Sequence, residues 1–259
     1  MNHKTKNWSR AVSYALSICT ISIGCAHVGP VPTMTVWQAA ETGNTEQLRL
    51  HVAARTDFNA RNADGRAPLH VATLALQPKA VEFLASHGAD VHAPEPRIGW
   101  TVLHNEVLNG HLETARLLIA MGADVNALDT GRRAPIIWAA GGGQLPAVEL
   151  LLDRGADIMT RTAADWTPLH VAAAIAYGEM MELMLQRGAT VDASDEKGQT
   201  PLHYSAGKGH AAGAALLIRH GADVNAKDNE GKRPLDLATD EGVRELLKQA
   251  AAIDNGATE

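Results

Sequence analysis

Short apolar stripes at helical spacing recur along most of the chain. Val148, Leu151 and Leu152 fall on one side of a helix, and the same spacing appears 33 residues earlier at Ala115 and Leu118. Glycine-containing polar stretches separate these segments. The pattern predicts a series of short helices. Since only 4% of the residues are aromatic, we expect these helices to pack closely through Ala, Leu and Val.

Two motifs repeat along the chain in a fixed register. The first is Gly-Ala-Asp-Val or a close variant, and its copies begin at Gly88, Gly122, Gly155, Gly188 and Gly221. The second is of the form Thr-Pro-Leu-His, and its copies begin at Ala67, Thr101, Ala134, Thr167, Thr200 and Arg233. Both series step by 34 residues once and by 33 thereafter. The extra residue is therefore predicted to lie in the connector 91–100 and not in a helix.

Each motif has a physical reason to stand where it does. Thr167 and Thr200 can cap a helix with their hydroxyls, and the proline that follows suits the first helical position, where its missing N–H is not needed. A glycine such as Gly155 can end the second helix in the left-handed conformation. One such unit cannot bury its apolar face alone, so we expect neighbouring units to stack around a continuous core.

These motifs, at this period, resemble the ankyrin repeat family over about residues 34–252. The resemblance implies an all-α solenoid of helix-turn-helix units with β-hairpin-like connectors. We expect five full repeats, starting near 64, 98, 131, 164 and 197, between an N-terminal cap (Val36–Ala60) and a C-terminal cap (Glu230–Ala251). In the family, the histidine of the second motif ties one repeat to the next.

Some copies depart from the pattern, and each departure predicts a weaker place in the stack. Ala67 and Ala134 replace the capping threonine, which costs about 1 kcal/mol each. Further departures are Val102 for proline, Ile137 for histidine and Asp165 for the turn glycine. Three glycines, 141–143, follow in the repeat that starts at 131, at about 0.5–1 kcal/mol each. We therefore expect this repeat to be the least stable of the five.

The resemblance implies that a partner protein binds on the concave surface formed by the connector tips and the first helices. Trp100 and Trp166 occupy two of these tips, and large aromatic side chains beside arginines are typical of binding hot spots. Gly141 and Gly142 are expected to leave a recess between them. The predicted site comprises Arg66, Leu74, Arg97, Trp100, Leu108, Arg132, Arg133, Arg161, Trp166 and Ile175. The alternative is that the two indole rings only pack against neighbouring connectors.

The first 25 residues have the pattern of an export signal. Lys4, Lys6 and Arg10 precede an uncharged apolar stretch, 11–24, which is short for a membrane-spanning helix. The stretch ends at Cys25 and resembles a bacterial lipobox, although Ser22 stands where Leu is usual. We expect a signal peptide (1–24), lipidation of Cys25, a short tether (25–33), the repeat domain (34–252) and a flexible tail (253–259). Cleavage by ordinary signal peptidase and a retained anchor are the alternatives.

Export would place the protein in a bacterial cell envelope. Removing residues 1–24 takes away three positive charges and no negative one, which changes the formal net charge from −6 to −9. The lipoprotein resemblance, with Ala26 after the cysteine, favours the periplasmic side of the outer membrane. A soluble periplasmic or secreted protein is the alternative, and a monomer is expected.

Several classes of function have no sequence support. The negative charge and the lack of a basic run argue against nucleic-acid binding. No metal, cofactor or catalytic motif is found, so we expect neither a metal site nor an enzyme. The favoured function is a non-catalytic scaffold for a partner protein. The alternatives are an accessory factor for a redox enzyme such as catalase, with haem handled by His87 and His92, an antagonist of a secreted toxin, or a structural spacer.

Overall fold

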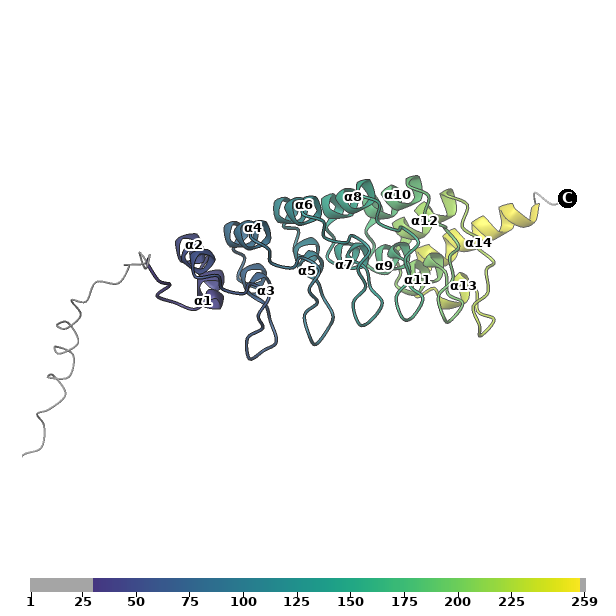
Figure 1. Ribbon diagram of the computed structural model, residues 1–259. Coiled ribbons are helices and arrows are strands. Elements are labelled where there is room, and N and C mark those ends of the chain that lie inside the picture. The colour runs from purple at the N-terminus through teal and green to yellow at the C-terminus, as the bar shows by residue number, and fades with distance from the viewer. Residues whose placement is uncertain (1–29, 257–259) are drawn as a thin grey trace, which may run out of the picture. The chain divides into compact units, whose positions relative to one another are not determined.

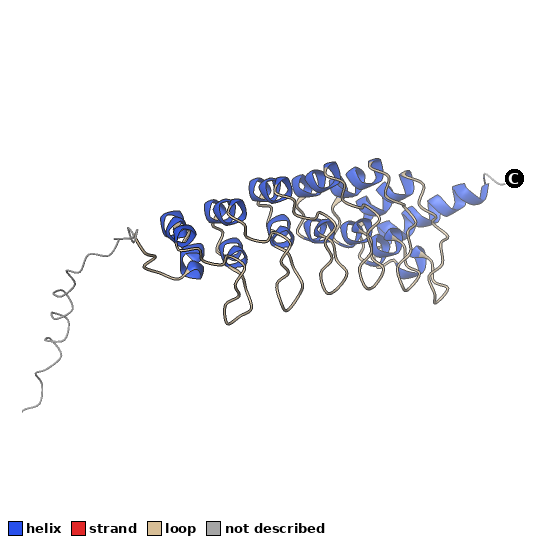
Figure 2. Cartoon of the chain, in the orientation of Figure 1, coloured by secondary structure: helices blue, strands red, loops and turns tan. Residues whose placement is uncertain are grey.

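The computed structural model describes residues 30–256, and the residues from Pro32 onward form one compact unit of seven consecutive helix pairs (Figure 1). The first helices of the pairs are α1 (Val36–Glu41), α3 (Pro68–Leu74), α5 (Val102–Leu108), α7 (Pro135–Gly141), α9 (Pro168–Ala174), α11 (Pro201–Gly207) and α13 (Pro234–Leu237). The second helices are α2 (Thr45–Ala53), α4 (Pro78–Ser86), α6 (Leu112–Ala120), α8 (Leu145–Asp153), α10 (Gly178–Gln186), α12 (Ala211–Arg219) and α14 (Glu241–Gly256). The described residues contain no strand (Figure 2). The expected all-α repeat stack is confirmed.

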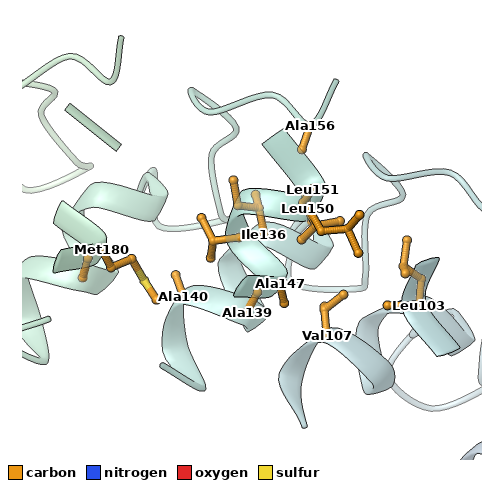
Figure 3. Close-up of a cluster of buried hydrophobic side chains, with 14 of the residues drawn as sticks. Leu103, Val107, Ile136, Ala139, Ala140, Ala147, Leu150, Leu151, Ala156 and Met180 are labelled. Atoms are coloured by element: carbon orange, nitrogen blue, oxygen red, sulfur yellow. The ribbon is translucent and has the colours of Figure 1, made fainter. Parts of the chain in front are cut away.

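The core lies between two parallel rows of helices. First helices contact first helices of the neighbouring pairs, and second helices contact second helices. Leu103 and Val107 of α5, Ile136 of α7, Leu151 of α8 and Met180 of α10 are all buried in this shared interior (Figure 3). The alanines between them allow the close approach that a core poor in aromatic residues requires.

The histidine of the Thr-Pro-Leu-His motif links successive repeats. The Nε2 atom of His104 donates to the carbonyl of Arg133 in the next connector at 3.1 Å, while Nδ1 accepts from the backbone N–H of Thr101. His170 and His203 make the equivalent bonds. His70 differs, because Ala67 has no hydroxyl and the buried Nδ1 atom of His70 has no hydrogen-bond partner.

The extra residue of the 34-residue step lies in the connector, as predicted. In the other connectors a backbone N–H bonds to the carbonyl four residues later, as from Asp129 to Arg133 at 3.1 Å. In the longer connector, the N–H of Glu95 reaches the carbonyl of Trp100, five residues later, at 2.7 Å. The insertion is therefore absorbed in one turn, and the helices on both sides keep their register.

The expectation for the three glycines 141–143 needs correction. A Cβ at Gly142 would lie 2.5 Å from the carbonyl oxygen of Leu108, so this glycine allows α5 and α7 to approach. Gly143 takes φ +69° in the turn between α7 and α8, where a glycine is suited. Only Gly141 has no such role. The predicted recess is absent at Gly142 because Leu108 fills that space.

The predicted C-terminal boundary of the repeat domain does not coincide with the end of a helix. Helix α14 continues to Gly256, so the boundary predicted at 252 falls inside a helix. The predicted signal peptide, Cys25 and most of the tether lie outside the described residues. Within residues 30–256, every helix is too short or too polar to cross a membrane.

Candidate functional site: the connector face

The connectors project from one side of the stack (Figure 1). Backbone hydrogen bonds join neighbouring connectors. The N–H of Thr130 donates to Ile98 at 3.0 Å, and that of Ala163 donates to Gly131 at 2.9 Å. Equivalent bonds join the later connectors. At the first junction the corresponding position is Pro96, which has no N–H to donate. We call the surface formed by the connectors and the exposed side of the first helices the connector face.

A mainly apolar hollow opens at this first junction. It has a volume of about 110 Å³ and lies between α3, the connector 91–100 and the start of α5. Three residues of the predicted site line it, and so do several that the sequence analysis did not select. The lining residues are Arg66, His70, Thr73, Leu74, Glu95, Ile98, Trp100, Thr101, Val102 and Asn105. The hollow therefore combines aliphatic and aromatic walls with one ion pair, between Arg66 and Glu95 at 3.4 Å.

The two predicted hot-spot tryptophans pack on the next repeat. The ring of Trp100 meets that of Trp138 edge-on at 4.5 Å, and Trp166 meets Tyr204 in the same way at 4.5 Å. Both tryptophans are half-buried. The structure thus shows the contacts that the packing alternative expects, and it leaves part of each ring exposed on the connector face.

A buried carboxylate anchors the first of these aromatic pairs. Asp129 accepts hydrogen bonds from the indole nitrogens of Trp138 at 3.0 Å and Trp100 at 3.3 Å, and from Nε of Arg133 at 2.9 Å. Burial would raise the pKa of Asp129, but hydrogen bonds from the backbone of Arg133, from Trp138 and from the backbone of Gly131 outweigh it and hold that pKa below its usual value. The carboxylate is therefore ionised and structural.

Three of the five predicted arginines make side-chain contacts within the stack, and two of them, Arg66 and Arg161, join neighbouring connectors. Arg66 pairs with Glu95, and the guanidinium of Arg133 lies 4.1 Å from the centre of the Trp138 ring. Arg161 donates to the carbonyls of Asp165 and Ser194, which belong to adjacent connectors. Arg97 and Arg132 are exposed on the connectors.

Of the three aliphatic residues of the predicted site, two are exposed and one is half-buried. Leu74 and Ile175 are exposed, at 49% and 40%, whereas Leu108 is half-buried against Gly142. The hollow brings together Arg66, Leu74 and Trp100. It does not include Trp166 or Ile175, which belong to repeats farther along the stack. Ile98 was missed because its equivalents in the later repeats, Gly131, Ala164 and Lys197, share no apolar pattern that marks this position.

The histidines proposed for haem handling have local partners. His87 stacks on Phe83 with ring centres 4.0 Å apart, and its Nδ1 atom lies 2.7 Å from the Phe83 carbonyl oxygen. His92 is exposed. In the described part of the chain, no three His, Cys, Asp or Glu side chains come close enough to hold a metal ion.

The repeat geometry and the comparisons with known proteins agree. A family model that describes three consecutive ankyrin repeats matches this chain over residues 36–129, 92–162, 128–195 and 169–258. The chain therefore belongs to the ankyrin repeat family, whose repeats indicate a scaffold for protein–protein interaction.

Solved structures and curated relatives extend this likeness. The ankyrin repeat domain of human ASB11 superimposes with a TM-score of 0.74 and 27% identity, over 84% of this chain and 97% of that one. The ankyrin repeat domain of Bcl-3 superimposes with a TM-score of 0.75 and 27% sequence identity, over 85% of this chain and 100% of that one. Human protein phosphatase 1 regulatory subunit 27 is 41% identical over 86 residues, 33% of this chain and 55% of the relative. Mouse cyclin-dependent kinase 4 inhibitor B is 35% identical over 98 residues, 38% of this chain and 75% of the relative. The chain thus spans about half the length of the phosphatase subunit.

Proposed function

We propose that this protein is a non-catalytic scaffold that binds a partner protein on its connector face. The observation that carries the proposal is the hollow at the first junction, where Leu74 and Ile98 expose apolar surface beside Trp100. An exposed apolar concavity with a polar rim is typical of a protein-binding surface. The names of the relatives, a phosphatase regulatory subunit and a kinase inhibitor, support a protein as the ligand.

Export to a bacterial cell envelope is the second part of the proposal. It rests on the basic start of the chain, the apolar stretch 11–24 and Cys25, which together resemble a lipoprotein signal. We propose that Cys25 carries a lipid and that the repeats face the periplasm from the outer membrane. Metabolic labelling with a palmitate analogue tests this: the mature protein should be labelled, and a Cys25→Ala variant should not. An unlabelled mature protein would refute the lipid anchor.

The binding proposal is tested with two matched substitutions. Ile98→Asp places a charge in the hollow, while Val52→Asp places one on α2, outside the hollow. The two side chains are suitable for comparison because they are similarly exposed, at 38% and 40%. Each variant is immobilised and exposed to solubilised envelope proteins from native cells, and a protein retained by the unsubstituted chain is identified and purified for direct titration.

The expected result is that this partner binds the Val52→Asp variant normally and the Ile98→Asp variant about tenfold or more weakly, a loss of at least ~1.4 kcal/mol. Circular dichroism should show that both variants remain folded. Equal binding to both variants would refute the assignment of the connector face.

A further inference from the structure

A buried acid stands at a repeat position that is otherwise occupied by small residues. Glu106 of α5 is only 3% exposed. The equivalent residues, 33 or 34 positions apart, are Ala39, Ala72, Ala139, Ala172 and Ser205, all buried. Burial of a carboxylate is unfavourable unless it is compensated, so a glutamate here is not explained by packing.

The neighbours of Glu106 form a polar cluster with it. Nδ1 of His111 lies 3.4 Å from one carboxylate oxygen, and the side-chain amide of Asn105 lies 3.4 Å from the other. Thr114 lines the same pocket as Glu106. All four residues belong to the repeat that starts at 98.

Glu106, His111 and Thr114 line a pocket between two repeats. The pocket has a volume of about 200 Å³ and is also lined by Thr73, Leu76, Gln77, Pro78 and Val81 of the preceding repeat. It opens at the turns between first and second helices, which lie at the opposite end of the helices from the connectors. The pocket shares only Thr73 with the lining of the hollow of the connector face.

The charge of Glu106 is less well compensated than that of the other buried acids. In the described residues these are Asp129, Asp195 and Asp228, and each accepts two backbone N–H groups within its own turn. Glu106 has side-chain partners only. Burial raises the pKa of Glu106, and the nearby His111 opposes that shift. A further cation in the pocket would stabilise the ionised carboxylate.

We propose that this pocket binds a lysine side chain of a partner protein. Leu76, Pro78 and Val81 supply an aliphatic wall for the four methylenes, and Glu106 at the base accepts the ammonium group. A lysine fits both features at once, because its apolar stem and terminal charge match an apolar wall that leads to a buried carboxylate.

The test uses n-butylammonium as a probe of the lysine side chain, with the full chain at pH 7.5. NMR signals of the histidine rings are followed during the titration. His220 is an internal control, since its Nε2 atom lies 3.2 Å from a carboxylate oxygen of Glu182, which is not part of the pocket. We expect a saturable shift of the His111 signal with a Kd of the order of 10 mM, a much smaller response of His220, and no saturable response to n-butanol.

Two variants make the outcome decisive. Glu106→Gln keeps the shape and removes the charge, so it should weaken binding of n-butylammonium about tenfold or more. Glu182→Gln should leave binding at His111 unchanged. If Glu106→Gln does not fold, Glu106→Ala replaces it, because alanine is the residue of the neighbouring repeats. The absence of a saturable shift at His111, or equal binding by the Glu106 variant, would overturn the proposal.

Discussion

Gly141 and Gly142 are adjacent at the end of α7, yet the same substitution should have opposite effects at the two positions. A Cβ at Gly142 would lie 2.5 Å from the Leu108 carbonyl oxygen and 3.1 Å from the Leu108 Cδ1 atom. A Cβ at Gly141 would find only Val171 Cγ1, at an ordinary contact distance of 3.8 Å. The backbone of Gly142, with φ −80° and ψ −3°, suits any residue, so only the close approach of α5 opposes a side chain there.

The magnitudes follow from these distances. Gly141→Ala should raise the free energy of unfolding by about 0.5–1 kcal/mol, because alanine loses less backbone entropy in a helix. Gly142→Ala should lower it by about 1–3 kcal/mol, the usual range for overpacking, since the obstructing atom belongs to the backbone and cannot rotate away. The two variants should therefore differ by roughly 1.5–4 kcal/mol.

Urea unfolding followed by circular dichroism measures both free energies. Hydrogen exchange of the amides of α7 shows whether the change is confined to that repeat, as the nearest-neighbour stability of a repeat stack implies. If both substitutions stabilise the protein, Leu108 does not fill the space beside Gly142. If both destabilise it equally, the helical position of Gly141 carries no entropic penalty. Either result would refute the reasoning.

Three further predictions concern the repeat motif. Ala67→Thr should stabilise the protein by about 1 kcal/mol in urea unfolding, because its hydroxyl would give the buried Nδ1 atom of His70 a partner; no gain would show that the atom is satisfied in another way. Ala176→Gly should raise the free energy of unfolding by about 1 kcal/mol, since Ala176 has φ +62°, a conformation that suits glycine better than alanine. Ala174→Gly, inside α9, should not stabilise the protein. The free energy of unfolding should be constant above about pH 6.5 and fall below that pH. The reason is that burial lowers the pKa of three histidines, so the folded state binds fewer protons than the unfolded chain. A flat profile of the free energy of unfolding from pH 7.5 to 5 would contradict this prediction. These histidines are His70, His104 and His170.

The repeat register could be read from the sequence because its determinants are local. A capping threonine, a proline at the first helical position and a glycine such as Gly155, which takes φ +87°, each act within one turn of chain. The position of the extra residue in the connector followed from the same spacing. These features predicted the number and order of the repeats correctly.

The contacts between repeats were harder to predict. Leu108 fills the space beside Gly142, and Arg161 bonds to two connector carbonyls. Both contacts depend on distances across the stack that the sequence of a single repeat does not specify. The hollow lies at the connector that carries the extra residue, and its lining residues follow no simple sequence pattern. Glu106, by contrast, is visible once the repeats are aligned, since its equivalents are alanine or serine.

The most direct test of partner binding is photo-cross-linking in native cells. Leu74, which is 49% exposed at the hollow, is replaced by benzoylphenylalanine, and Val52 on α2 is replaced in a control. If the connector face binds a partner protein, irradiation should give one discrete adduct from position 74 and none from position 52. Adducts from both positions, or from neither, would contradict this assignment.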